Sequence, residues 1–216
     1  MLEIFHVLDP LLTQPIPPPS SSLNQALHLA ASKGLANVVE TLIEFGASVS
    51  CQDHFGRTPL LEAIRNNYHS VAALIFSRGG TLGFVTFEPE RVLSGERVLV
   101  PGRGTSRHGS KEKSMINAGS ELCWAAQAGD NTYLRHLLEF GCPVDACDYD
   151  ARTCAHLAAC GNLLPTTIIL LEFGADFSSV KVKDRWGNTP LDDAKRLGHS
   201  KIVDAIRTLD HAPPSL

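Results

Sequence analysis

Apolar residues along this chain fall into pairs of short segments with helical spacing, and the pairs recur at a fixed interval. From Gln25 to Thr58 the interval is 33 residues, and from Ser120 to Thr153 it is 33 again, before a last copy opens at Thr189. Apolar residues at helical spacing predict amphipathic helices. A fixed period of about 20–50 residues predicts stacked supersecondary units, each too small to bury its own apolar face.

Each copy predicts a turn followed by two helices, most clearly in the second copy. Gly56 suits a turn that needs positive φ. Thr58 is a favourable N-cap, Pro59 fits the first helical position, and Gly79 can end the second helix. The predicted fold is an all-α solenoid of helix-turn-helix units with β-turn or hairpin tips and about five repeats.

In this register the chain resembles the ankyrin-repeat family, through Thr58-Pro59-Leu60, Thr189-Pro190-Leu191 and glycines at fixed offsets. Asn67 and Asn162 stand where that family has a mid-repeat glycine, and Ala151 replaces the turn glycine. The resemblance implies a scaffold that binds a protein partner on its concave face, with no catalysis of its own and no cofactor.

The interval from Thr153 to Thr189 is three residues longer than one repeat, and the largest break in the period is the 62-residue interval from Thr58 to Ser120, which exceeds one repeat by 29. The excess has two further interpretations beside a plain flexible linker: a basic docking or phosphorylation segment, and an artefact of the gene model. We expect an apolar start and Pro/Ser-rich linker in 1–22, two repeats in 23–86, a flexible Gly/Ser/basic insertion in 87–115, three repeats in 116–210 and a disordered tail in 211–216.

Composition narrows the partners and the compartment. The net charge of −4 and the scattered Lys and Arg residues argue against a nucleic acid or an anionic membrane bound mainly by charge. No apolar run reaches the ~18–20 residues that span a bilayer, and the start of the chain lacks the basic residues of a secretory signal. We expect a cytoplasmic protein with reduced cysteines, and a nuclear location stays open.

One motif points to catalysis. Arg78-Gly79-Gly80-Thr81-Leu82-Gly83 resembles the glycine-flanked nucleophilic threonine of asparaginases. Gly79, however, is in register with the helix-ending Gly46, Gly141 and Gly174. A nucleophile also needs an adjacent base, and no such base accompanies Thr81 in this pattern. The repeat therefore accounts for the motif, and we expect no enzyme activity.

Two further groups contain metal-binding or acid–base residue types. The adjacent Asp192 and Asp193 point apart on a helix and suit a helix N-terminus. His156 takes the helix-opening position of the repeat, and the cysteines near it fit small apolar positions. We therefore predict a structural role, without metal, for the group whose spacing allows a zinc site: Cys142, Cys147, Cys154, His156 and Cys160.

The remaining candidates lie on the predicted binding surface. Turn tips and first helices of stacked repeats line one side of the solenoid, and aromatic and arginine side chains concentrate binding energy at interfaces. The predicted protein-binding residues are His54, Phe55, Arg57, Trp124, Gln127, Tyr149, Asp150, Arg152, Arg185, Trp186, Asn188 and Arg196.

A subfamily resemblance is also present. Gly119–Cys123 and Asp148-Tyr149-Asp150 resemble the ankyrin tails of cytosolic asparaginase/lysophospholipase-like enzymes, and Asp184–Leu191 also resembles glutaminase tails, plant potassium-channel tails and ankyrin-bearing plant kinases. The main prediction is a protein–protein interaction module with an unidentified partner and oligomeric state. The alternative is a non-catalytic regulatory or oligomerising tail of an asparaginase-like amidohydrolase or of an ion channel, present here as a truncated chain.

Overall fold

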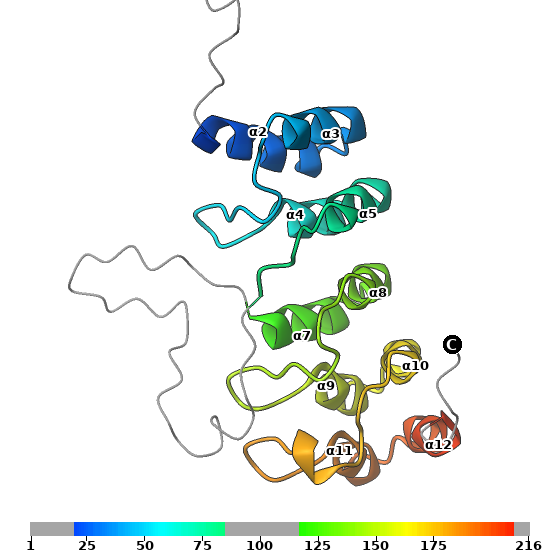
Figure 1. Cartoon of the computed structure of the whole chain (residues 1–216). Helices are drawn as coiled ribbons and strands as arrows, with labels where there is room; N and C mark the ends of the chain where they lie inside the picture. The colour runs from blue at the N-terminus through cyan, green and yellow to red at the C-terminus, as the bar shows by residue number, and fades with distance from the viewer. Residues whose placement is uncertain (1–19, 85–116, 210–216) are drawn as a thin grey trace, which may run out of the picture.

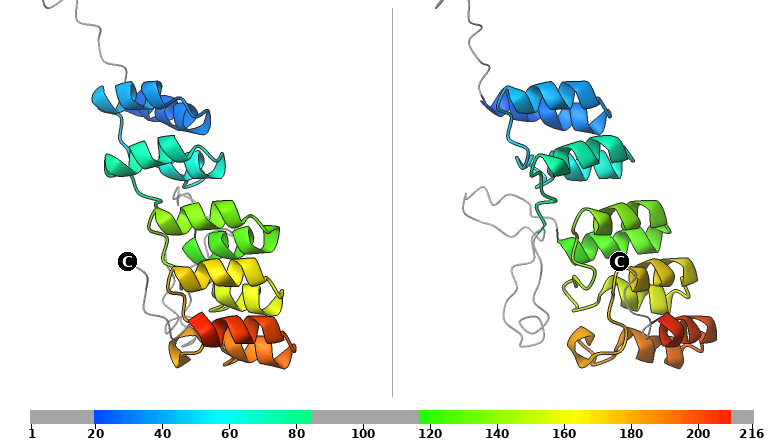
Figure 2. Two further views of the ribbon diagram at one scale, coloured as in Figure 1. Left: turned by 90° about the vertical axis from the view of Figure 1, so that its right-hand side faces the viewer. Right: turned by 45° about the vertical axis from the view of Figure 1, so that its right-hand side comes forward.

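The computed structural model describes residues 20–84 and 117–209, which form ten α-helices stacked as five pairs in one line (Figures 1 and 2). This arrangement confirms the predicted all-α repeat fold. The pairs, called repeats 1 to 5, are α2 (Ser20–Ser32) with α3 (Ala36–Glu44), α4 (Pro59–Arg65) with α5 (His69–Ser77), α7 (Ala118–Ala128) with α8 (Asn131–Glu139), α9 (Cys154–Cys160) with α10 (Leu164–Glu172), and α11 (Pro190–Arg196) with α12 (Ser200–Leu209).

The first helix of each repeat, here called its inner helix, lies on the side from which the long loops project (Figure 1). The second, outer helices form the opposite side. Three of the loops, here called tips, precede α4, α9 and α11 and comprise residues 52–57, 147–152 and 183–188. A short 3-10 helix, η1 (Val180–Val182), fills the extra length that the sequence places before the last tip.

The predicted helix starts are confirmed in atomic detail. The Thr58 hydroxyl accepts a hydrogen bond from the Leu61 amide, and Pro59 occupies the first turn of α4. At α11, Thr189 and Asp192 form a capping box, in which each side chain binds the other residue's backbone amide. These bonds satisfy amides that a helix leaves without an internal partner.

The three tips share one hydrogen-bonding plan. In the first, Asp53 Oδ1 accepts bonds from the amides of Phe55 and Arg57, both 2.8 Å long. Asp148 and Asp184 make the equivalent pairs of bonds in the other two tips. An aspartate that binds the backbone two and four residues ahead holds the turn in shape, so the tips are ordered scaffolds for the side chains between.

Residues in the left-handed backbone region mark the turns of the repeat. Gly56 has the positive φ predicted for it, 79°. Asn67, Asn162 and Ala151 also keep positive φ, at 61°, 54° and 57°. Asparagine tolerates this region better than most residues. The three departures from the glycine pattern therefore preserve the backbone conformation, although Ala151 does so at a cost.

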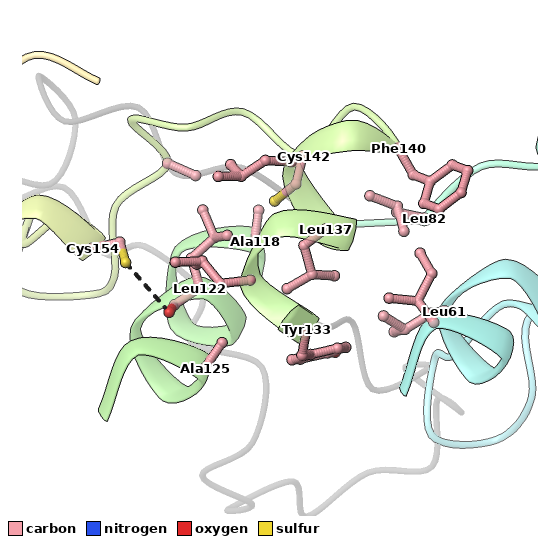
Figure 3. Packing of buried hydrophobic residues seen from close by; sticks show 14 of the residues in the cluster. Leu61, Leu82, Ala118, Leu122, Ala125, Tyr133, Leu137, Phe140, Cys142 and Cys154 are labelled. Atoms are coloured by element: carbon pink, nitrogen blue, oxygen red, sulfur yellow. Dashed lines mark hydrogen bonds between the residues drawn. The ribbon is translucent and has the colours of Figure 1, made fainter. Parts of the chain in front are cut away.

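The core lies between the repeats. An isolated helix of seven residues, the length of α4, α9 and α11, is not stable in water, so it depends on its neighbours. Leu27, Leu60 and Leu122 on successive inner helices are fully buried. Figure 3 shows Leu61 and Leu82 of repeat 2 on the side facing Leu137 and Phe140 of repeat 3. Burial of each such side chain contributes roughly 1.5–3 kcal/mol.

Stacking changes at one junction. Elsewhere inner helices pack on inner helices and outer on outer, but between repeats 2 and 3 the main pairing joins α4 to α8. The Phe76 and Phe140 rings meet edge to face, 5.4 Å apart. A cleft of about 370 Å³ lies against them, lined also by Gly80, Leu82 and Phe84. The altered stacking therefore falls where the sequence period breaks.

The described residues cover part of the predicted domain organisation. Helix α2 begins at Ser20, three residues before the predicted first repeat boundary at 23, so Ser20–Ser22 belong to a helix. The expected insertion in 87–115 and the expected tail in 211–216 lie outside the described residues.

Substitution of Gly129 tests whether the left-handed backbone conformation at a helix end contributes to stability. Gly129 ends α7 with φ of 72°, and a Cβ built there has no atom within 4 Å. Gly129→Ala is expected to lower the free energy of unfolding by ~1–2 kcal/mol, the cost of an L-residue in the left-handed region. Gly129→Asn is expected to cost about half as much or less. Urea denaturation followed by circular dichroism measures both; equal losses would show that backbone handedness is not the cause.

Candidate functional site

The tips and inner helices carry exposed aromatic side chains. Phe55, Tyr149 and Trp186, one on each tip, have exposed fractions of 51%, 59% and 63%. Trp124, on α7, is 53% exposed. Large apolar groups of this kind are usually buried, so their gathering on one side of the stack marks a candidate interaction surface.

Arginines pack on two of these rings. The Arg57 guanidinium lies over Phe55, 5.1 Å from the ring centroid, and binds Glu62 at 2.9 Å. Arg185 lies over Trp186 at 5.6 Å and pairs with Asp150 of the preceding tip. Cation–π stacking and ion pairing hold the aromatic ring and the guanidinium of each pair in place. A surface that is already ordered loses less conformational entropy when a partner binds.

The inner helices add two columns of side chains, because positions three apart on a helix share one face. In repeat register, the first column contains Glu62, Trp124, Leu157 and Asp193, and the second contains Arg65, Gln127, Cys160 and Arg196. Together with the tip residues 53–57, 148–152 and 184–188, these columns form what we call the inner face.

Side chains of the two columns join neighbouring repeats. Arg65 binds Glu121 at 3.1 Å and lies over the Trp124 ring at 5.9 Å, which links α4 to α7. Glu121 also accepts a 2.6 Å hydrogen bond from the Tyr133 hydroxyl. Burial and the Glu121 charge together raise the pKa of Tyr133, so this phenol stays protonated and donates.

A second network spans repeats 4 and 5. Asp193 is nearly buried and accepts a 2.8 Å bond from Arg196 and a 3.2 Å bond from the Cys160 thiol. Arg152 approaches the same carboxylate at 3.9 Å and the Cys160 sulfur at 3.2 Å. Burial first, and then the bond to Asp193, raise the pKa of Cys160, which keeps the thiol protonated.

The structure separates the predicted binding residues into two groups. Asn188 serves the scaffold, because its amide binds Asp184 and its carbonyl accepts from His156. Arg57, Asp150 and Arg152 are half-buried and ion-paired. The exposed members of the set are His54, Phe55, Trp124, Gln127, Tyr149, Arg185, Trp186 and Arg196.

Glu62, Arg65, Leu157, Cys160 and Asp193 were not predicted as binding residues. The signal was available, because these residues share repeat positions with the predicted Trp124, Gln127 and Arg196. Of the inner-helix positions, the prediction included only Trp124, Gln127 and Arg196.

The asparaginase-like motif has a structural explanation. Gly79 has φ of 83°, and the Gly80 amide bonds to the Ile75 carbonyl to close α5. A Cβ on Gly80 would meet the Ile75 side chain at 2.5 Å. Thr81 is exposed, and its hydroxyl lies 3.4 Å from that of Ser50. These glycines therefore end a helix, as the repeat register predicts.

The cysteine and histidine group also serves the scaffold. The donor atoms of Cys142, Cys147, Cys154, His156 and Cys160, all within the described ranges, do not meet at one point. The Cys154 thiol donates to the Leu122 carbonyl at 3.5 Å, as Figure 3 shows. Burial raises the pKa of Cys142 to about 12 and that of Cys147 to about 11. Buried, protonated thiols of this kind are unreactive at neutral pH.

His156 illustrates how the repeat uses its histidine. Nδ1 accepts a 3.1 Å bond from the Thr153 amide, so Nε2 carries the proton and donates to the Asn188 carbonyl at 3.1 Å. The ring thereby ties α9 to the last tip. Burial lowers the pKa of His156, in agreement with a neutral imidazole that has its Nδ1 lone pair in use.

The family model described as "Ankyrin repeats (3 copies)" matches residues 6–82 and 122–212. The chain belongs to the ankyrin-repeat family. Ankyrin repeats are a non-catalytic module that typically mediates protein interactions, so the predicted family and module class are confirmed.

Relatives of this ankyrin-repeat chain include parts of much longer proteins. It is 38% identical over 99 residues to the potassium channel GORK of Arabidopsis thaliana, which is 46% of this chain and 12% of the channel. It is 38% identical to the serine/threonine-protein kinase VIK of the same plant, over 45% of this chain and 22% of the kinase. It is 35% identical to the liver isoform of mitochondrial glutaminase from Rattus norvegicus, over 45% and 15% of the two chains.

The match therefore spans less than a quarter of each of these three relatives. The Asp184–Leu191 segment predicted a resemblance to plant potassium channels, plant kinases and glutaminases, and the three relatives belong to these groups. The likeness to asparaginase tails stays a prediction. Among the helices of residues 20–84 and 117–209, none has the length and apolar character to cross a bilayer.

The burial of His156 predicts that the stability of the protein depends on pH. Because the folded pKa of His156 lies below its ordinary value of 6.5, the unfolded chain binds more protons between the two values. The stabilisation is complete above pH 6.5 and is lost as the pH falls through this window. His28, whose pKa burial also lowers, acts in the same direction.

We expect the urea midpoint to fall between pH 7.5 and 5.5, and to fall less in His156→Asn than in the wild type. The variant will be less stable at pH 7.5, so the slope against pH, and not the midpoint itself, is the measurement. Parallel slopes in the two proteins would assign the pH dependence to other groups.

Proposed function

We propose that this ankyrin-repeat protein binds a protein partner on its inner face and catalyses no reaction of its own. The observation that carries the proposal is the ordered row of exposed aromatic groups, one on each of the three tips with Trp124 on α7. Two of the tip rings lie under arginines that are themselves ion-paired. Rigid aromatic anchors beside arginine are typical of binding hot spots.

The charge distribution indicates the kind of partner. Arg57, Arg152 and Arg196 are paired with Glu62 or Asp193, so the inner face presents balanced charges and not a basic stripe. A nucleic acid needs an excess of positive charge along its path. A folded protein or a peptide with apolar side chains and polar groups of both signs is the better complement, and it needs no cofactor.

For the compartment, we propose the cytoplasm, with the nucleus as the alternative location. The described residues contain no disulfide bond. Burial keeps four of the six thiols, Cys123, Cys142, Cys147 and Cys154, away from solvent and raises the pKa of each. Such thiols suit a reducing environment.

A second candidate function places the same module in a longer protein, as a regulatory or oligomerising tail. The relatives favour it, because the matched region is a small part of a channel, a kinase and a glutaminase. Light scattering coupled to size exclusion separates the candidates in part. A defined oligomer of the isolated chain favours the tail, and a monomer that binds a different protein favours the stand-alone module.

The test of the inner face uses two side chains from separate tips. A partner is first isolated with the full chain as bait, and its affinity is then measured by calorimetry. Trp186→Ala combined with Arg57→Ala is expected to weaken binding by about 30-fold or more. Because Trp186 is 63% exposed, the double variant is expected to keep its circular dichroism spectrum.

Ile168→Ala serves as the control, since Ile168 is 37% exposed on the outer helix α10. It is expected to bind the partner with unchanged affinity. Loss of affinity in the control but not in the double variant would place the binding site on the outer side. If Trp186→Ala alone unfolds the protein, the tryptophan is structural and the proposed anchor is wrong.

A further inference from the structure

The outer side of the junction between repeats 2 and 3 brings together three side chains that can bind a metal ion. His69 is the first residue of α5, and His136 and Glu139 lie on α8. Their ligand atoms all lie within 4.8 Å of one another. His69 Nε2 and Glu139 Oε2 are 3.5 Å apart.

The fold explains why these groups meet. His136 and Glu139 are three residues apart on α8 and therefore share one face of the helix. The start of α5 lies against that face of α8, with the His69 and His136 rings 4.8 Å apart. Phe140 lies against His69 at 5.5 Å and forms an apolar floor beside it.

An ion pair alone does not account for the cluster. His69 and Glu139 have side-chain exposures of 54% and 37%, so a salt bridge between them contributes little. His136 is not part of that pair. Its Nδ1 is buried and has no hydrogen-bond partner among the described residues. A buried imidazole nitrogen without a partner is uncommon and calls for a further interaction.

We propose that His69, His136 and Glu139 bind a Zn²⁺ ion that links repeat 2 to repeat 3. Two imidazoles and one carboxylate are a ligand set that zinc accepts, with water in the fourth position. Zinc bonds of about 2.0–2.1 Å place tetrahedral ligand atoms about 3.3 Å apart. The 3.5 Å between His69 and Glu139 already fits this spacing.

Zinc binding requires the ligand atoms, which lie within 4.8 Å of one another, to move closer together by rotation of their side chains. His69 is more than half exposed, so a rotation of its side chain meets little packing resistance. The bound ion would join two helices across the one junction where the regular stacking is altered. Its effect on stability follows from mass action, because the unfolded chain does not hold the three ligands together.

The experiment titrates the full chain with Zn²⁺ alone in competition with a chromophoric chelator. Because thiols also bind zinc, it is done in a Cys51→Ser, Cys160→Ser background, which removes the two cysteines that are not fully buried. We expect one ion per chain. We expect His69→Asn, His136→Asn and Glu139→Gln each to weaken binding by about tenfold or more.

His54→Asn is the matched control, because His54 is an exposed histidine on a tip outside the cluster. Zinc is expected to raise the melting temperature of the background protein and of His54→Asn, and to raise that of His69→Asn by less at the same zinc concentration. Hydrogen exchange should slow in α5 and α8 together when zinc is added, since the ion joins them.

The proposal is wrong if zinc binds equally to the background protein and to His69→Asn, or if the His54→Asn control loses binding to the same extent. It is also wrong if the background protein binds no zinc. His69→Asn carries the decision if His136→Asn proves unstable, because the exposed His69 can be replaced without disturbing the core.

Discussion

Stacking of each helix pair on the next is the interaction on which this structure depends. The inner helices α4, α9 and α11 have seven residues each, too few for a helix that is stable alone. Their buried leucines and alanines lie on helices that pack both on the paired outer helix and on the neighbouring repeat. Turn hydrogen bonds, caps and left-handed residues fix the shape of each unit, but the free energy that holds the units folded comes from the contact between units.

Stacking also determines the arrangement of the proposed binding surface. Because the repeats share one register, side chains distant in sequence become columns on the inner face. Arg65 reaches Trp124 and Glu121 of the next repeat, and Cys160 reaches Asp193. A change at one column position therefore alters contacts in two repeats, so a substitution on the proposed binding surface also affects the stacking.

The sequence predicted the fold well because its signals are local and periodic. Caps such as Thr58, turns such as Gly56 and the helix-opening His156 are each set by residues within a few positions. The period then placed them in a stack. The structural roles of Gly79 and of the cysteines followed from the same register.

The stacking at the junction of repeats 2 and 3 could not be predicted from that register. A 29-residue excess in sequence carries no information about the angle at which two repeats meet. A signal for the proximity of His69 and His136 was nonetheless present. When the 29-residue excess is subtracted, these two residues are 38 positions apart, which is also the separation of Glu40 and Arg78, an ion pair between repeats 1 and 2. The role of Arg65 at this junction was missed for a different reason, because its partners Glu121 and Trp124 are recognised only in three dimensions.

The exposure of Trp124 and Trp186 has a spectroscopic consequence. The chain has two tryptophans, and both are more than half exposed in the folded state. Native emission should therefore already be close to that of an indole in water and should shift little on denaturation. The same indoles would report the loss of water from the inner face, so intrinsic fluorescence is a poor measure of folding for this protein and a sensitive measure of what covers that face.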